Sequence, residues 1–321
     1  MRSIVEILSE GKYVSGEEIS RELGVSRAAV WKRINALREQ GWQIESGGKR
    51  GYRLISGDSL APELWTGSLT TTRLGRGENR YLAETDSTNT QVKQMAMQGA
   101  PDGSLCLAEC QTAGKGRLGR RWVSPAGQGL WMSVLLRPHI KPDQAPLITL
   151  CAAMAMARAV QEVSGEACVI KWPNDLVHGG KKICGILLEL GADPDAIEYV
   201  VVGTGLNMRR GAYPPELAER AISVEEFAPL PKRRDIVVHY LEALEGLIDR
   251  LEEGGFAAIE AEYVKNSCTL GKRVQVTGSV SLLGTAEAID ETGALLVRDD
   301  EGQLHRVLSG DVSVRGVMGY V

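Results

Sequence analysis

The sequence predicts an α+β protein of two or three domains, because three different residue patterns follow one another along its 321 residues. The first stretch has apolar residues at helical spacing and ends in a hairpin pattern. The middle alternates strand-like and helix-like segments, and the last contains only short strands separated by turns. We place the boundaries at 1–60, 65–268 and 269–321. A hydrophobic content of 43% with 24% charged residues is typical of a folded soluble protein.

Three helices are expected in the first 40 residues. Apolar residues from Ile4 to Leu8 recur at helical spacing, and Gly11 ends that helix. Ser15 starts the second helix, because Glu18 follows three residues later in the pattern of a capping box. Ser26 starts the third. The apolar stripe of this third helix consists of Val30, Ile34 and Leu37.

The outward side of the third helix is polar and basic, and it presents Ser26, Arg27, Ala28, Trp31, Lys32 and Asn35. Alternating residues on both sides of a GGKRG turn then predict a hairpin with Lys49 and Arg50 at its tip. Residues 26–54 hold seven basic and two acidic residues in a chain of net charge -4. The pattern indicates a winged helix-turn-helix whose third helix enters the major groove while the wing neutralises phosphates. A winged helix used only for protein contacts is the alternative.

The central stretch is expected to form an α/β domain with a mixed sheet, and polar clusters lie between its strands. Asp86 to Asn89 follow a strand and open a helix, where free backbone N–H groups and short polar side chains suit a ligand carbonyl or urea. A plain helix cap would explain one of these residues. The segment from Gln111 to Trp122 combines three glycines with four cations, so that the backbone can approach phosphate and carboxylate oxygens.

This glycine-rich segment is neither a Walker loop nor a dinucleotide fingerprint, because it does not lead into a helix. A flexible basic surface loop is the alternative. A third cluster, KWPND from Lys171 to Asp175 with Lys182 downstream, places an ammonium at the mouth of a strand near amide and carboxylate groups. A fourth, GTGLN from Gly203 to Asn207, offers an amide at a strand end.

In combination, the motifs STN, GKGRLGRRW, KWPND with KKICGI, and GTGLNM resemble those of biotin protein ligases in order and context, over essentially the whole chain. With the leading winged helix, the chain resembles the bifunctional form known as the biotin operon repressor. The resemblance implies that biotin and MgATP give biotinyl-5′-AMP and pyrophosphate, after which a lysine of the biotin carboxyl carrier protein of acetyl-CoA carboxylase attacks the mixed anhydride. It also implies repression through operator DNA, with a homodimer when the adenylate is bound.

The resemblance assigns roles residue by residue. Biotin would be bound by Ser87, Thr88, Asn89, Gln111, Lys115, Gly116, Arg117 and Lys182. The nucleotide would be bound by Arg117, Arg120, Trp122, Asn174, Lys182 and Asn207, with Lys182, Arg117 and Lys115 as the catalytic set. Two departures stand out. Lys115 occupies a position where the family usually has Arg, and Ala221 lies where some members cover the adenine with an aromatic ring. The metal ligands are left unassigned.

The last stretch alternates in short strands separated by TGS, DETG and DDEG turns, which predicts a small SH3-like barrel. It carries no catalytic set of its own. In the family this cap lies near the active site and the carrier protein.

Several classes of function are disfavoured. No stretch approaches the roughly 18 uninterrupted apolar residues of a membrane helix, so we expect a cytoplasmic protein with no membrane partner. The six cysteines form no CxxC pair and are expected to be buried free thiols. Two alternatives to the ligase remain. One is a transcription factor that only senses a small molecule, and the other is a lipoate or octanoyl ligase.

Overall fold

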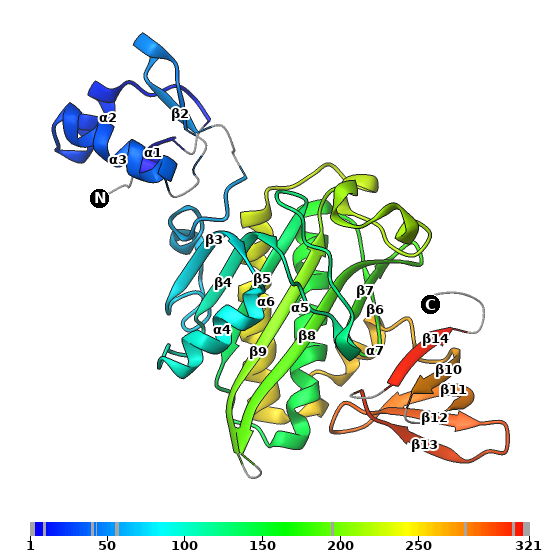
Figure 1. The fold of residues 1–321 in the computed structure, drawn as a ribbon. Coiled ribbons are helices and arrows are strands. Elements are labelled where there is room, and N and C mark those ends of the chain that lie inside the picture. Colours follow the sequence, from blue (N-terminus) through cyan, green and yellow to red (C-terminus); the bar gives the residue numbers. More distant parts are fainter. Residues whose placement is uncertain are drawn as a thin grey trace.

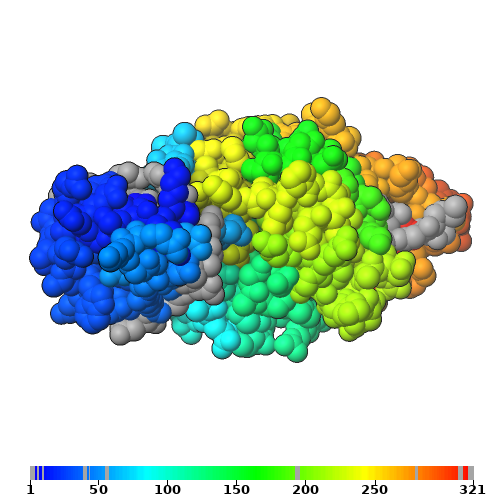
Figure 2. Space-filling model, turned by 90° about the horizontal axis from the view of Figure 1, so that it is seen from above, coloured from blue at the N-terminus to red at the C-terminus, as the bar shows by residue number. Residues whose placement is uncertain are grey.

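The computed structural model describes residues 4–8, 11–39, 42, 44–54, 58–193, 196–278, 281–309 and 312–316. The winged helix lies at one end of an elongated molecule and the C-terminal residues at the other (Figures 1 and 2). The large mixed sheet lies between them (Figure 1).

The winged helix-turn-helix is confirmed. It consists of α1 (Ile4–Leu8), α2 (Gly16–Leu23), α3 (Arg27–Glu39) and the antiparallel pair β1 (Ile44–Ser46) and β2 (Tyr52–Leu54). Ser15 caps α2 through its oxygen, which accepts from the Glu18 N–H at 3.1 Å, and the Ser26 oxygen accepts from Ala29 N–H at 3.2 Å. Val30 and Ile34 are buried in the small core beneath the hairpin, together with Leu54.

The central sheet has seven strands in the order β3-β4-β5-β9-β8-β7-β6. Only β3 and β4 run parallel, and the other neighbours are antiparallel. The strands are β3 (Asn79–Thr85), β4 (Leu105–Gln111), β5 (Gly129–Leu136), β6 (Val169–Lys171), β7 (Asp175–His178), β8 (Lys181–Asp193) and β9 (Ala196–Asn207).

Helices cover the two faces of this sheet unequally (Figure 1). The long helices α5 (Ala145–Ser164) and α6 (Arg233–Gly254) pack together on one face, with the short α7 (Glu260–Asn266) beside them. On the other face α4 (Thr88–Met97) covers only β4, β5 and part of β9. The rest of that face, over β8 and the carboxyl half of β9, carries the candidate site.

The apolar composition of helix α5 follows from its packing in the core. The segment Pro142–Ser164 is long and apolar enough to cross a membrane by length and composition. However, α5 is buried along most of its length between the sheet and α6, which accounts for its apolar character.

The C-terminal strands occur where they were expected, but the closed barrel is not confirmed. They are β10 (Arg273–Gly278), β11 (Leu282–Ile289), β12 (Leu295–Asp299), β13 (Leu304–Val307) and β14 (Val312–Gly316). Their order is β13-β12-β11-β10-β14, so β13 and β14 are opposite edges of an open sheet in the described part of the chain. Alternation in a sequence predicts strands but does not specify whether the two edges pair. The buried side of this sheet, including Val274 and Leu295, is continuous with the central core.

Candidate functional site

The floor of the site is a bare patch of sheet made by glycines. Gly205 of β9 stands opposite Gly185 of β8, and Gly203 lies one pleat further along. Alternate residues of β9 point to the same face, so these glycines leave space above the sheet. A Cβ on Gly205 would lie 2.4 Å from the Trp122 Nε1 atom, and one on Gly203 would lie 2.0 Å from the Asn89 Oδ1 atom. Only glycine therefore lets these side chains reach the floor.

A cavity of about 340 Å³ opens above this floor. The cavity is lined by all the residues predicted to bind biotin or the nucleotide. These residues come from all four polar clusters of the sequence. This volume is in the range of small-molecule sites. The structure therefore brings these separate segments together at one cavity, whereas the role of each residue stays a prediction.

One end of the cavity is polar and neutral. Ser87, Thr88 and Asn89 are buried at the start of α4. The Gln111 Oε1 atom accepts from the Thr88 backbone N–H at 2.9 Å, while the Ser87 hydroxyl makes no capping hydrogen bond within the described helix. Helix capping by Ser87 therefore does not explain this cluster. The Ser133 hydroxyl lies 2.7 Å from Thr88 Oγ1 and 2.6 Å from Asn89 Oδ1.

Asn89 is held in place by an acidic partner behind it. Its Nδ2 donates to Glu189 at 2.7 Å, and Lys93 forms an ion pair with the same carboxylate. Burial would raise the pKa of Glu189, but the hydrogen bonds from Lys93 and Asn89 lower it overall. The Asn89 amide is thus oriented by its partners before any ligand arrives.

The basic segment folds as a tight loop over the cavity. Its two sides pair at Lys115 with Arg121 and at Gln111 with Ser124. Leu118 adopts φ +56° at its tip, a left-handed conformation that is uncommon for leucine. Arg117 reaches inward, where its Nη1 donates to Asn174 Oδ1 at 3.1 Å and its Nη2 donates to the Ser309 carbonyl. The loop therefore connects the central sheet to the C-terminal sheet.

Lys182 stands over the middle of the floor. Its Nζ is 2.6 Å from Asp175 Oδ1 and 5.0 Å from the centre of the Trp122 ring. Nearby, the Asn174 Nδ2 donates to the Ile186 carbonyl at 2.7 Å and the Asn207 Nδ2 donates to the Ile222 carbonyl at 3.2 Å. Each amide therefore keeps its Oδ1 side for other partners, and that of Asn174 faces Arg117.

Trp122 lies inside the cavity rather than on the surface. Its ring meets Trp131 edge to face at 6.5 Å, and its buried Nε1 has no hydrogen-bond partner among the described residues. A buried indole N–H without a partner is uncommon, and here the Nε1 atom faces the glycine floor at Gly205.

Apart from Ala221, sequence reasoning named no residue in two walls of the cavity, although the resemblance placed the C-terminal cap near the active site. One is the segment that follows β9, which contributes Tyr213, Leu217 and Arg220. The other is the C-terminal strand β14, which contributes Val314 and Arg315. Neither segment shows a motif, since both act by position. Ala221 lines the cavity without a ring, and Tyr213 and Trp122 line the same cavity with aromatic side chains.

Buried Lys171 also lines the cavity. Burial lowers its pKa to about 8, although Asp175 acts in the opposite direction. Burial also lowers the pKa of Arg117, again opposed by Asp175. Both cations are partly desolvated, a state that strengthens their interaction with an anion.

Thiols and metal clusters play no visible part in the site. Burial raises the pKa of Cys106, Cys151 and Cys168 to about 12, so these thiols are inert at neutral pH. Two of the six cysteines, Cys110 and Cys268, are only partly buried, which the sequence did not predict. Among the described residues no group of three or more His, Cys, Asp or Glu side chains could hold a metal ion.

The predicted DNA-binding face is exposed. On α3 the side chains of Arg27, Ala28 and Lys32 are open to solvent and Trp31 is 58% exposed. Asn35, which is half-buried, accepts from Arg38 at 3.2 Å. On the wing Lys49 is exposed, and the Arg50 guanidinium lies 4.2 Å from the centre of the Tyr13 ring.

Family models match all three regions of the chain. Residues 81–207 match the biotin/lipoate A/B protein ligase family, residues 1–53 match an HTH domain, and residues 269–315 match the biotin protein ligase C terminal domain. Among solved structures, the biotin protein ligase from Aquifex aeolicus in complex with biotin and ATP is similar with a TM-score of 0.66 and 28% identity, covering 74% of this chain and 99% of that one.

Curated relatives extend the match to the full length. The biotin–[acetyl-CoA-carboxylase] ligase of Mycobacterium tuberculosis is 34% identical over 79% of this chain and 97% of its own. The bifunctional ligase/repressor BirA of Escherichia coli is 29% identical over 97% of this chain and 96% of its own. The bifunctional ligase/repressor BirA of Bacillus subtilis is 34% identical over 98% of both chains. The chain therefore belongs to the biotin protein ligase family, in the group of bifunctional ligase/repressors that carry an HTH domain ahead of the ligase.

Proposed function

We propose that the cavity joins biotin to ATP, and that the chain then transfers biotin to a lysine of the biotin carboxyl carrier protein of acetyl-CoA carboxylase. The observation that supports this is the convergence of the four motif clusters on one cavity that is neutral at one end and cationic at the other. Biotin has the same polarity, with a neutral ureido head and an anionic tail.

At the neutral end, Ser87, Thr88, Asn89 and Gln111 would bind the ureido group. A urea offers one acceptor and two donors, and these side chains present hydroxyls and amides that can supply both kinds of partner. Asn89 is oriented by Glu189, and Gln111 is held by Thr88 and by Ser124, to whose hydroxyl its Nε2 donates at 2.8 Å. This prior orientation lowers the entropy cost of binding.

At the cationic end, Lys115, Gly116, Arg117, Arg120 and Lys182 would surround the biotin carboxylate and the phosphates. A carboxylate oxygen attacks the α-phosphorus, and the bond to the β-phosphate oxygen breaks so that pyrophosphate leaves. Both reactants are anions, and the cations offset their repulsion as charge develops. Lys182 would turn from Asp175 toward the reacting oxygens on its flexible four-carbon chain.

The nucleoside would lie between Trp122 and the amides of Asn174 and Asn207, with Tyr213 in the opposite wall. Mg²⁺ would enter with the ATP phosphates, whose charge it neutralises. Asn174 and Asp175 are oxygen donors in the cavity that suit this ion, and hard cations of this kind commonly keep most of their ligands from water and phosphate.

In the second step the neutral amine of the carrier lysine attacks the acyl carbon of biotinyl-5′-AMP. The bond from this carbon to the phosphate oxygen breaks, AMP leaves, and the amine loses its proton to solvent. This step needs no side-chain nucleophile from the ligase. The walls from β14 and from Tyr213 to Ala221 keep water from the mixed anhydride.

The enzymatic test is biotin-dependent release of pyrophosphate from MgATP, followed by labelling of a biotin carrier domain. Lipoate and octanoate serve as competing substrates. Pyrophosphate release that depends on lipoate instead of biotin identifies the related ligase class. If well-folded protein releases no pyrophosphate with biotin, lipoate or octanoate, the result supports a sensor that performs no chemistry.

The second proposed activity is repression. The exposed basic face of α3 and the wing, from Ser26 to Arg50, suits a major groove and its flanking phosphates. The adenylate would order the basic loop and favour a homodimer, since a two-fold operator needs two winged helices. Footprinting with and without biotinyl-adenylate tests this, and equal protection in both states rules out control by the adenylate. We infer that the chain acts in the cytoplasm, because the proposed reaction needs ATP and the carrier protein.

The domain limits 1–60, 65–268 and 269–321 are part of the same proposal. They assign one unit to DNA, one to chemistry, and one SH3-like unit to closing the cavity and receiving the carrier protein.

A further inference from the structure

The first turn of α6 carries a buried arginine that joins three other segments of the chain. Arg233 is 5% exposed. Its Nη1 and Nη2 donate to the two oxygens of Glu109 on β4, at 2.9 Å each. Its Nε donates to Asp58 Oδ2 at 2.8 Å and its backbone N–H donates to Asp58 Oδ1 at 2.6 Å. Burial alone would lower the pKa of Arg233, but Glu109 and Asp58 raise it overall.

This cluster touches the winged helix. Asp58 is the first described residue after the wing, and the neighbouring Ser59 is buried and hydrogen-bonded to Tyr81. The Tyr81 hydroxyl of β3 donates to Glu109 Oε1 at 2.5 Å. The Tyr81 ring meets Trp42, which packs on the core of the winged helix, edge to face at 6.3 Å. Burial, followed by the Glu109 charge, raises the pKa of Tyr81.

The same cluster touches the strands that carry the ligand site. Glu109 precedes Gln111 by two residues on β4, so the backbone of one strand joins the partner of Arg233 to a residue of the cavity. Arg233 Nη1 also donates to the Gly129 carbonyl at 3.1 Å, and Gly129 is paired in register with Asn207. Gln111 and Asn207 line the cavity. Arg233 is therefore linked to Gln111 through Glu109 on the same strand, and to Asn207 through the strand partner Gly129.

We propose that Asp58, Tyr81, Glu109 and Arg233, called here the Arg233 joint, are positioning residues that couple occupancy of the cavity to the placement of the winged helix. The inference rests on the proposed function for the ligand and for DNA. A shift of β4 or β5 on ligand binding must either carry Asp58 and Tyr81 with it or break a buried, charge-assisted hydrogen bond. Because coupling is reciprocal, the ligand changes DNA affinity by the same factor as DNA changes ligand affinity.

The decisive quantity is this coupling factor, the ratio of DNA dissociation constants without and with biotinyl-adenylate. The DNA is a duplex selected in vitro by the adenylate-bound full chain. Two variants perturb the joint mildly. Tyr81→Phe removes only the tyrosine hydroxyl that donates to Glu109. Glu109→Gln removes the negative charge beside Arg233 and keeps a side chain of similar shape. Both are measured as the full chain, with thermal unfolding as the check of folding.

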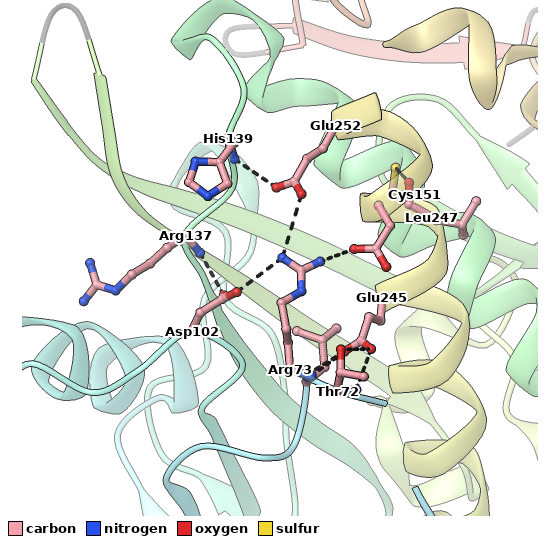
Figure 3. Close-up of polar contacts among 11 residues, drawn as sticks. Thr72, Arg73, Asp102, Arg137, His139, Cys151, Glu245, Leu247 and Glu252 are labelled. Carbon is pink, nitrogen blue, oxygen red and sulfur yellow. Dashed lines mark hydrogen bonds and ion pairs between the residues drawn. The ribbon is translucent and has the colours of Figure 1, made fainter. Parts of the chain in front are cut away.

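Two matched controls separate coupling from stability. Tyr263→Phe removes a hydroxyl from a fully buried tyrosine on α7, away from the joint. Arg73→Gln breaks a second arginine cluster beside α6, in which Arg73, from the segment before β3, contacts Asp249 of α6 at 2.5 Å. Arg73 also contacts Asp102 at 3.4 Å (Figure 3). In the same view, Glu245 accepts from the backbone N–H groups of Thr72 and Arg73 at 2.7 and 2.9 Å, which fixes the far end of the connector to α6.

The expected result is a coupling factor lowered at least fivefold in Tyr81→Phe and in Glu109→Gln, and unchanged in both controls even where these lower the unfolding temperature. The reciprocal ratio for the adenylate, measured with and without DNA, falls by the same factor. If folded Tyr81→Phe keeps the wild-type coupling factor, the proposal that the Arg233 joint couples the two sites is wrong. If the wild-type chain itself shows no coupling, the proposed repressor activity fails and the joint fails with it, which is a distinguishable outcome. If Glu109→Gln does not fold, Tyr81→Phe decides alone.

Discussion

The glycine floor is the feature of the site whose perturbation can be worked out most directly from the structure. In Gly205→Ala the new Cβ would lie 2.4 Å from Trp122 Nε1 and 2.7 Å from its Cε2 atom, far inside contact distance. The β9 backbone at this position is paired on both sides, with Trp131 of β5 and Gly185 of β8, so it cannot move away. Trp122, which belongs to the loop over the cavity, must move instead.

Inserting a methyl into a packed site costs about 1–3 kcal/mol. Because the displaced side chain belongs to the loop, we expect this cost to appear mainly in binding. A loss of 1–3 kcal/mol corresponds to about a 5- to 150-fold weaker affinity for ATP or adenylate. The global unfolding temperature is expected to change little, because the loop contributes little to the core.

The assay is equilibrium titration with ATP and biotinyl-adenylate, combined with biotin-dependent pyrophosphate release and thermal unfolding. The matched control is Gly246→Ala on the exposed side of α6, where an added Cβ meets nothing within 4 Å. This control should raise stability by about 0.5–1 kcal/mol through helix propensity and leave binding unchanged. Wild-type affinity in a folded Gly205→Ala variant would show that Trp122 and the bare floor are not part of the nucleotide site.

Three further predictions concern charged residues. Lys182→Met is expected to lower biotin-dependent pyrophosphate release about 100- to 1000-fold, the usual effect of losing one preorganised electrostatic contact, and a rate within tenfold of wild type would remove Lys182 from the catalytic set. Burial lowers the pKa of Lys171 to about 8 from the ordinary 10.5. Between these two pH values the unfolded chain therefore binds more protons than the folded chain. As a result, the contribution of Lys171 to the free energy of unfolding rises with pH in this range. The stability of wild type relative to Lys171→Met should therefore increase from about pH 8 to about pH 10.5 in urea titrations, and a constant difference would refute the desolvation of Lys171. Lys32→Ala and Lys49→Ala should each reduce the slope of log affinity for DNA against log salt by about 1 while leaving pyrophosphate release unchanged; an unchanged slope would show that the residue does not contact a phosphate.

Local patterns predicted the local structure of this chain well. The stripe of Val30 and Ile34, the serine cap at Ser26 and the glycine turn before Tyr52 are short-range features, so periodicity and capping were sufficient to predict the winged helix. The polar clusters stood out for a related reason, since packing alone does not require GKGRLGRRW or KWPND between apolar strands.

Only the tertiary structure decided what depends on distant segments meeting. Strand alternation could not show that β13 and β14 remain opposite edges, because edge pairing depends on register and curvature. No motif marked Tyr213 or Arg315 as a cavity wall, because each acts through its place in the fold. The motifs KKICGI and GTGLNM contain Gly185 and Gly205, but only the strand pairing shows that these two glycines stand opposite each other. The same holds for Arg233, whose partners Asp58 and Glu109 lie more than 100 residues away in sequence. The sequence by itself determined the family chemistry, which is carried by contiguous motifs, whereas the shape of the cavity and its link to the winged helix follow from contacts that only folding creates.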